Sequence, residues 1–331
     1  MKAIILTKYG SPDLLQVKEV ETPLPKENEV LIKIHSASIN DWDWGLVRGK
    51  PFYIRLLCGM TRPKINIPGA DISGRIESVG KAVKKLQVGD DVYGDISECG
   101  FGGFAEYVCV PENELALKPA KMSHEEAAAI PHAAMLAVQG LHDRGELREG
   151  QKLLINGAGG GVGTMGVQIA KSVGAEVTGV DSAEKAEMMR SLGFDHTIDY
   201  KSEDFTKNGQ QYDLILDTKT NRSVFDYARA LKPGGIYATV GGTTPRLIEA
   251  LLLAPIIRRL RKKFIRIVAL KPNKDLEYIN ELFEAGKIKP VIDGPYKLRD
   301  VPEAIQYFGE GKHKGKVIIT IGRNLEMEAK R

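Results

Sequence analysis

The chain has 331 residues, of which 47 are basic and 43 acidic, so its formal net charge is only +4. This balance excludes a protein dedicated to binding nucleic acid, and a hydrophobic content of 43% is sufficient for well-packed cores. The three cysteines show no pairing pattern and no apolar run is long enough to span a membrane, so we expect a reduced, cytoplasmic protein without membrane insertion. The length predicts two domains.

The first third of the sequence is rich in predicted strands and poor in helical periodicity. Apolar or alternating runs punctuated by glycine and proline predict strands at 1–8, 29–36, 69–79, 91–93, 104–110 and 115–118. The tetrapeptide 123–126, Ser-His-Glu-Glu, is a capping box and predicts the start of an alanine-rich helix. Predicted strands and helices then alternate to about residue 270.

The most informative segment is 152–171, where an apolar run is followed by a glycine-dense turn and an apolar-periodic stretch. This order predicts a strand, a tight loop and a helix, and the loop matches the dinucleotide-binding fingerprint with alanine in the first glycine position. Glycines let the backbone approach a pyrophosphate, and the start of a helix offers free N–H groups to the anion. We expect the following residues to contact the diphosphate: Ala158, Gly160, Gly161, Val162 and Gly163.

Three further apolar runs, 176–181, 212–217 and 235–240, alternate with helical stretches. Repeated strand–helix units predict a parallel, doubly wound sheet, and this context favours a dinucleotide site over a glycine-rich turn of another α/β protein. A bound nicotinamide dinucleotide implies hydride transfer. Gly241 and Gly242 follow the last of these strands and are expected to let the backbone approach the nicotinamide ring; the alternative is a simple tight turn.

The end of the chain returns to the first domain. An amphipathic helix is predicted at 273–285 and a strand at 316–321, followed by a polar tail, 323–331, that we expect to fray. The predicted dinucleotide domain, 123–270, is therefore inserted into a β-rich domain formed by 1–122 and 271–331.

Motifs along the whole chain carry a family resemblance. They lie at 67–74, 88–94, 102–107, 158–163, 232–235 and 284–290. Together they resemble the medium-chain dehydrogenase/reductase superfamily, in its zinc-independent quinone oxidoreductase-like branch. The resemblance implies a Rossmann domain inserted in a GroES-like catalytic domain, and an NAD(P)H-dependent reductase of a small quinone or enone. It also implies a homodimer that pairs an edge strand of the Rossmann sheet, for which 264–270 is the candidate.

The resemblance also bears on metal. The catalytic zinc ligands of the zinc-dependent members fall at Asn40, Ala70 and His132 here, and only the histidine is a good zinc ligand. Of the cysteines, only Cys99 and Cys109 lie near the structural-zinc lobe, which needs four. We therefore expect no zinc. Without a Lewis acid, conjugated carbonyls are the favoured acceptors, because the charge spreads to a distant oxygen that needs only hydrogen-bond donors.

Two residues are candidates for catalysis. Segment 40–49 resembles a family motif, and it implies that Asn40 donates to the substrate oxygen or to the nicotinamide amide. Tyr53 is a candidate proton donor, with solvent as the alternative. Asp71 interrupts an apolar strand, so a buried carboxylate there needs a partner, either a backbone amide or an arginine such as Arg75.

The signals for the cofactor conflict. Asp181 lies about 20 residues beyond the glycine loop, where a carboxylate binds the adenosine ribose diol and repels a 2′-phosphate. Ser182, Lys185 and Tyr200 instead resemble the positions with which NADPH-dependent quinone reductases hold that phosphate. We favour NADPH, with NADH as the alternative.

Three other functions remain as alternatives: an enoyl-thioester reductase, a non-catalytic NADPH-binding regulatory protein and a zinc alcohol dehydrogenase.

An apolar stretch, 247–260, that ends in the basic run 258–263 has two interpretations. It is either a surface helix that binds anionic lipid or an anionic substrate tail, or a solvated helix end whose cations suit the helix dipole. The sequence favours the second.

Overall fold

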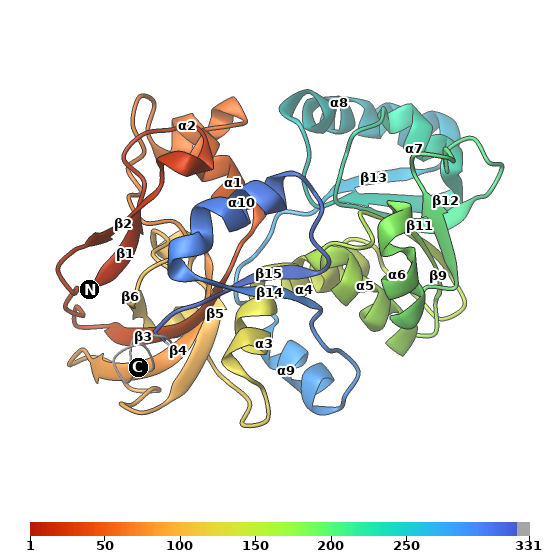
Figure 1. Ribbon diagram of the computed structural model, residues 1–331. Coiled ribbons are helices and arrows are strands. Elements are labelled where there is room, and N and C mark those ends of the chain that lie inside the picture. Colours follow the sequence, from red (N-terminus) through yellow and green to blue (C-terminus); the bar gives the residue numbers. More distant parts are fainter. Residues whose placement is uncertain (323–331) are drawn as a thin grey trace. The chain divides into compact units, whose positions relative to one another are not determined.

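The computed structural model describes residues 1–322 (Figure 1), so the predicted frayed tail lies outside the described residues. The chain forms two compact units. The first contains Met1–His132, Pro272–Asn280 and Val291 onward, and the second contains Ala133–Lys271 and Glu281–Pro290. The boundary predicted before residue 123 differs, because helix α3 (His124–Ala129) packs on strands of the first unit.

Within the described residues, the first unit is built on a seven-stranded sheet with the order β14-β15-β3-β4-β5-β7, in which β6 also pairs with β3. Its strands are β3 (Glu29–Ser38), β4 (Asp71–Val79), β5 (Asp91–Asp95), β6 (Tyr107–Pro111), β7 (Ala116–Leu117), β14 (Ile292–Lys297) and β15 (Lys316–Thr320). A separate hairpin joins β1 (Lys2–Ile5) to β2 (Gln16–Glu19). Because β15 pairs with β3, residues from the end of the chain enter a sheet begun near its start.

Two helices in the first third correct the prediction of an almost helix-free segment. They are α1 (Asp41–Arg48) and α2 (Phe52–Cys58). The Asp43 carboxylate accepts the Asn40 N–H at 2.9 Å to cap α1, and Gly49 ends it at φ 60°. Both helices span about two turns, too few for the apolar period to stand out.

Besides α3, two further helices of this unit come from later in the chain. They are α10 (Val301–Gly309) and the start of α9 (Leu276–Glu284). The predicted helix at 273–285 begins later than expected, because Asn273 has a left-handed backbone at φ 60°. Its side-chain amide instead donates to the Asp95 carbonyl at 2.8 Å and accepts the Asp95 N–H at 2.9 Å.

In the described chain, the second unit holds a six-stranded parallel sheet with the order β10-β9-β8-β11-β12-β13. Numbered within the unit, this is the order 3-2-1-4-5-6 of dinucleotide-binding folds, which confirms the predicted fold class. The strands are β8 (Lys152–Asn156), β9 (Glu176–Asp181), β10 (His196–Asp199), β11 (Tyr212–Asp217), β12 (Leu231–Thr239) and β13 (Phe264–Ile267). The helices are α4 (Pro131–Val138), α5 (Gly161–Ser172), α6 (Ala186–Ser191), α7 (Val224–Ala230) and α8 (Thr244–Arg261).

The order of this sheet positions the site. The chain adds β9 and β10 on one side of β8 and then adds β11, β12 and β13 on the other side, so the strand order reverses between β8 and β11. Ligands of such sheets bind at the carboxyl ends of the strands beside this switch point. The glycine loop follows β8 at that point. At the far side of the sheet, β13 forms an edge, so the predicted edge segment 264–270 does supply an edge strand, although a shorter one.

Candidate active site

The glycine loop presents unbonded backbone donors at the start of α5. Gly160 is the N-cap with an extended backbone, and the first helical hydrogen bond runs from the Thr164 N–H to the Gly160 carbonyl at 2.9 Å. The N–H groups of Gly161, Val162 and Gly163 precede that bond. They are therefore available to an anion, and they lie at the positive end of the helix dipole.

Gly163 is fixed by close packing between α5 and the end of β8. A β-carbon at this position would lie 2.4 Å from the Ala158 carbonyl oxygen and 2.5 Å from that of Gly157. Both neighbours are backbone atoms, and Ala158 is fully buried, so they have no room to move. Residues 157–163 thus form the cradle that a dinucleotide diphosphate requires.

Asp181, at the tip of β9, is already engaged by its surroundings. Its carboxylate accepts the N–H groups of Gly159 and Ser182, each at 2.9 Å, and forms an ion pair with Lys185 at 3.4 Å. The Tyr200 N–H donates to the Asp181 carbonyl at 3.2 Å. The four residues predicted to bind the ribose or its phosphate therefore lie together at the tip of β9. Asp181 and Lys185, whose charges predicted different cofactors, form an ion pair with each other.

A buried network around Asp217 supports the carboxyl ends of three strands. Asp217 is fully buried and accepts the Asn156 amide at 2.8 Å and the Tyr237 hydroxyl at 2.7 Å. Asn156 ends β8, Asp217 ends β11 and Tyr237 lies in β12. None of these residues was predicted from the sequence, although a polar residue at the end of an apolar strand is a signal that marks Asn156 and Asp217.

The same network reaches the two glycines after β12. Thr220, whose N–H donates to Asp217 at 3.1 Å, donates its hydroxyl to the Gly241 carbonyl. Gly242 has φ 146°, and a β-carbon there would lie 2.4 Å from the Thr220 β-carbon. This loop is therefore held in one conformation that only glycine adopts without strain.

In the first unit, a second buried network centres on Asp71. Its carboxylate accepts the Ser38 hydroxyl, the Asn40 amide and the Lys316 ammonium, each at 3.0 Å. It also accepts the His132 N–H at 3.2 Å. The predicted backbone-amide partner is present, but the predicted arginine is not, because Arg75 points to solvent and pairs with Asp91 at 2.8 Å.

Asn40 is held from three sides. Besides its bond to Asp71, its amide oxygen accepts the Lys316 ammonium, and Asp43 accepts its backbone N–H. Asp43 also accepts the Gly69 N–H at 2.8 Å, and burial raises the pKa of this carboxyl to about 7. One of the two amide protons of Asn40 remains available for a ligand.

No motif in the sequence marked Lys316 or Asp95 as part of this polar cluster. Lys316 lies in β15, more than two hundred residues from its partners, and Asp95 ends β5. Only the pairing of distant strands brings them beside Asn40, Asp71 and His132.

Tyr53 does not belong to this network. It lies in α2, half-buried, and packs on the apolar core of its own unit. Burial raises the pKa of its hydroxyl. The structure thus joins Asn40 to a polar cluster and leaves Tyr53 outside it.

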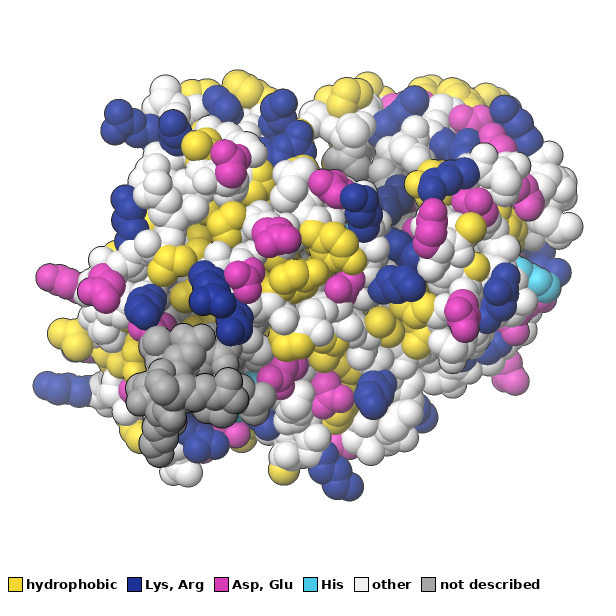
Figure 2. All heavy atoms as spheres, in the orientation of Figure 1, with side chains coloured by type: hydrophobic (Ala, Val, Ile, Leu, Met, Phe, Trp, Pro, Cys, Tyr) yellow, Lys and Arg dark blue, Asp and Glu magenta, His cyan; other side chains and the backbone are white. Residues whose placement is uncertain are grey.

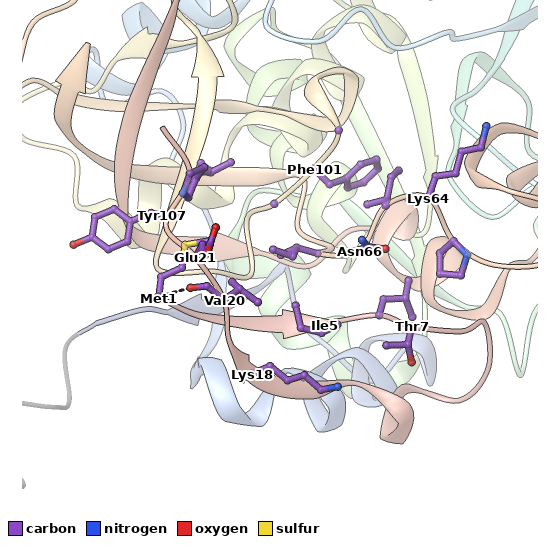
Figure 3. A pocket seen from close by; sticks show the side chains of 18 of the residues that line it. Met1, Ile5, Thr7, Lys18, Val20, Glu21, Lys64, Asn66, Phe101 and Tyr107 are labelled. Atoms are coloured by element: carbon purple, nitrogen blue, oxygen red, sulfur yellow. Dashed lines mark hydrogen bonds between the residues drawn. The ribbon is translucent and has the colours of Figure 1, made fainter. Parts of the chain in front are cut away.

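A groove of the first unit lies elsewhere (Figure 3). It encloses about 960 Å³ beside β1, where the terminal ammonium of Met1 donates to the Val20 carbonyl at 2.7 Å. Its walls include Ile5, Asn66 and Phe101. None of the predicted site residues lines it, so it contributes nothing to the catalytic assignment.

Comparison with known proteins decides the family. A family model for the alcohol dehydrogenase GroES-like domain matches residues 26–120, and one for zinc-binding dehydrogenases matches 192–319. A 2-methylene-furan-3-one reductase from Solanum lycopersicum is 35% identical, over 96% of this chain and 79% of that relative. The chain belongs to the medium-chain dehydrogenase/reductase superfamily, in its quinone oxidoreductase-like branch. It is an oxidoreductase, as the motifs predicted.

Two other members of the superfamily show the extent of the similarity. A chloroplastic NADPH-dependent alkenal/one oxidoreductase from Arabidopsis thaliana is 33% identical, over 96% of this chain and 79% of that relative. The solved structure of a quinone oxidoreductase from Coxiella burnetii has a TM-score of 0.85 at 26% identity, and the match covers 97% of this chain and 99% of that one. The similarity therefore extends through both units.

His132, one of the three residues at the zinc positions of this superfamily, belongs to a cluster of possible metal ligands whose members are engaged with one another and with Lys316. Ligand atoms of Asp71, Asp95 and His132 lie within 4.8 Å of one another. However, Asp71 holds the Lys316 ammonium at 3.0 Å, and His132 holds Asp95 at 3.0 Å. Asn40 and Ala70 stand where better ligands would be needed, so this donor set does not fit a catalytic zinc.

The pair of His132 and Asp95 predicts a pH dependence of stability. Burial opposes a charge on His132, but the hydrogen bond and charge of Asp95 outweigh it and raise the pKa of the imidazole. The native state then binds this proton more tightly than the unfolded state does. We expect the free energy of unfolding to fall as pH rises above 6.5, the ordinary pKa of histidine, and through the raised pKa of the native state.

Urea denaturation of the natural protein and of His132→Gln across this range tests the expectation. The variant should lack the part of the slope that His132 contributes, and Asp43 titrates equally in both proteins. Parallel stability curves for the two proteins would contradict a charged His132.

Proposed function

We propose that the chain is an NAD(P)H-dependent reductase that transfers hydride to a quinone or an α,β-unsaturated carbonyl without a metal. The observation that carries the proposal is the cradle of residues 157–163 at the switch point of the parallel sheet. The names of the relatives, which refer to alkenals, enones and quinones, support the acceptor class.

In this proposal the chain binds, orients and donates. The N–H groups of Gly161, Val162 and Gly163 hold the diphosphate, and the backbone at Gly241 and Gly242 lies against the nicotinamide. The nicotinamide, when bound, supplies the hydride. Asn40 donates its remaining amide proton to the acceptor's oxygen, where negative charge develops.

Lys316 and Asp71 make Asn40 a better donor. The ammonium draws electron density from the amide oxygen, and the carboxylate fixes the amide plane through the other N–H. Hydrogen bonds in such a chain polarise one another in a low-dielectric site. Tyr53 or solvent then delivers the proton to carbon.

A parallel spectrophotometric screen of quinones and enones with NADPH and NADH tests the proposal. Turnover of at least one class is expected, with no loss of activity after chelation and no stoichiometric zinc. Faster turnover of crotonyl thioester than of naphthoquinone would instead indicate the enoyl-thioester reductase. Tight NADPH binding without turnover of any acceptor would indicate a regulatory protein, and one zinc per chain an alcohol dehydrogenase.

We propose NADPH as the preferred cofactor, because Lys185 brings a cation to the tip of β9, where its ammonium pairs with Asp181, and the backbones of Ser182 and Tyr200 also contact Asp181. Asp181→Ser should increase the preference for NADPH over NADH about tenfold, since the lysine then keeps its charge for the 2′-phosphate. Lys185→Ala should reduce the preference by a similar factor. The ratio of kcat/KM for the two cofactors measures both effects, and unchanged ratios in both variants would place the phosphate elsewhere.

Two broader properties belong to the same proposal. The edge strand β13 offers free backbone groups for pairing with a second copy, so we propose a homodimer. Sedimentation analysis of the natural protein and of an Ile265→Pro variant tests it.

We also propose a cytoplasmic location, which fractionation of the source cells checks.

A further inference from the structure

Helix α8 exposes an apolar face that its own unit does not cover. It runs for 18 residues, and its buried positions, Ala250 and Ile257, are seven residues apart on one side. Much of the remaining circumference carries exposed apolar residues, namely Ile248, Leu251, Leu252, Ile256 and Leu260. The three leucines are 67%, 66% and 75% exposed, so this is a large apolar surface rather than a single exposed side chain.

The same helix ends in a cluster of cations without acidic partners. Arg258, Arg259, Arg261 and Lys262 are exposed, and within residues 1–322 none of the four forms an ion pair. Two of them instead lie over aromatic rings, Arg258 on Phe264 at 5.4 Å and Arg261 on Phe225 at 5.8 Å. Figure 2 shows hydrophobic and basic side chains together at the top of the view, where Figure 1 places α8.

The acidic content of α8 is equally informative. Its one carboxylate, Glu249, is paired with Arg246 at 2.5 Å. The exposed surface of the helix therefore combines aliphatic side chains with uncompensated positive charge. The solvated helix end that the sequence favoured explains the cations, but it does not explain the exposed leucines.

The first unit carries a helix of similar composition. In α2, Phe52, Leu56 and Leu57 are 63%, 60% and 66% exposed. Arg55 lies between them in the sequence. Arg55 is only partly exposed, and its guanidinium donates to the Gly49 carbonyl at 3.2 Å, so α2 shares the exposed apolar residues of α8 but not its uncompensated cations.

We propose that α8 is an interfacial helix that docks the protein on an anionic lipid surface, with its leucines in the acyl boundary and its cations at the headgroups. Helices with an apolar face and a basic rim bind membranes in this way. In the described residues, no helix has the length and hydropathy to cross a bilayer, so the helix lies on the surface.

A second copy of the chain fits this surface less well. A two-fold interface brings the same patch of both copies together, so it would face two cationic helix ends with no free carboxylate between them. Anionic lipid supplies both the missing negative charge and the apolar medium.

Flotation of the full chain with vesicles tests the proposal. Vesicles of phosphatidylcholine with about 30% phosphatidylserine should bind the protein, and pure phosphatidylcholine should bind it at least tenfold less. The variant R258Q/R259Q/R261Q/K262Q should lose at least a hundredfold in partition coefficient, at about fivefold for each cation. The variant L251S/L252S/L260S should also lose binding. Because this variant keeps every cation, its loss would show that the leucines enter the lipid and that charge attraction alone does not hold the protein.

A matched control removes the same charge from another surface. K81Q/K84Q/K85Q/K121Q neutralises four exposed lysines of the first unit and should bind as the natural protein does. Thermal unfolding confirms that each variant is folded. Equal loss in both charge variants would reduce the effect to net charge and overturn the proposal. So would a leucine variant that becomes monomeric while its vesicle binding stays unchanged, since α8 would then be an interface between copies.

Discussion

Lys316→Met is expected to destabilise the protein by about 3 kcal/mol or more, because it leaves the Asp71 carboxylate buried without a counter-charge. Both groups of the pair are almost fully buried, and Lys316 also holds the Asn40 amide oxygen. Urea denaturation at neutral pH measures the loss. The same variant should show reduced kcat, since Asn40 loses the contact that orients and polarises it.

The ion pair of Arg75 and Asp91 provides the matched control. It has good geometry at 2.8 Å, but the arginine is 56% exposed, and Arg75→Met should cost at most about 1 kcal/mol. Adding Asp71→Asn to Lys316→Met should recover most of the lost stability, because no uncompensated charge then remains. A cost as small as that of Arg75→Met would contradict the role assigned to Lys316.

These two ion pairs show how far the sequence could predict the site. Local patterns were sufficient for the glycine loop, the parallel strands and the capping box at residue 123, because each depends on neighbours within a few residues. They could not choose between Arg75 and Lys316 as the partner of Asp71. That choice depends on the pairing of β15 with β3, which joins residues from opposite ends of the chain.

The cofactor signals illustrate the same limit. Asp181 and Lys185 predicted opposite cofactors when each was considered alone, but the structure pairs them at 3.4 Å. The carboxylate also turns toward the N–H groups of Gly159 and Ser182, an orientation that the spacing of residues does not encode. Helices α1 and α2 were missed for a different reason, because two turns are too short to display a period.

Gly163→Ala is expected to weaken binding of NADPH and NADH by at least about a hundredfold. A β-carbon 2.4 Å from one backbone oxygen and 2.5 Å from another forces the start of α5 away from the end of β8. The N–H groups that we assign to the diphosphate lie on this turn, and a displacement of about 1 Å is enough to lose charge-assisted hydrogen bonds worth about 1.5–3 kcal/mol each. Calorimetric titration of both cofactors measures the change.

Gly166→Ala is the control within the same helix. Its β-carbon would lie 3.2 Å from the terminal Cδ1 of Ile155, a side-chain atom that can shift. Both substitutions improve helix propensity by about 1 kcal/mol, so a difference between them reports on packing at the loop alone. Gly166→Ala should bind both cofactors within about threefold of the natural protein and unfold at a similar temperature. If Gly163→Ala binds as tightly as this control, the diphosphate does not rest on the amides of residues 161–163, and the dinucleotide site must lie elsewhere.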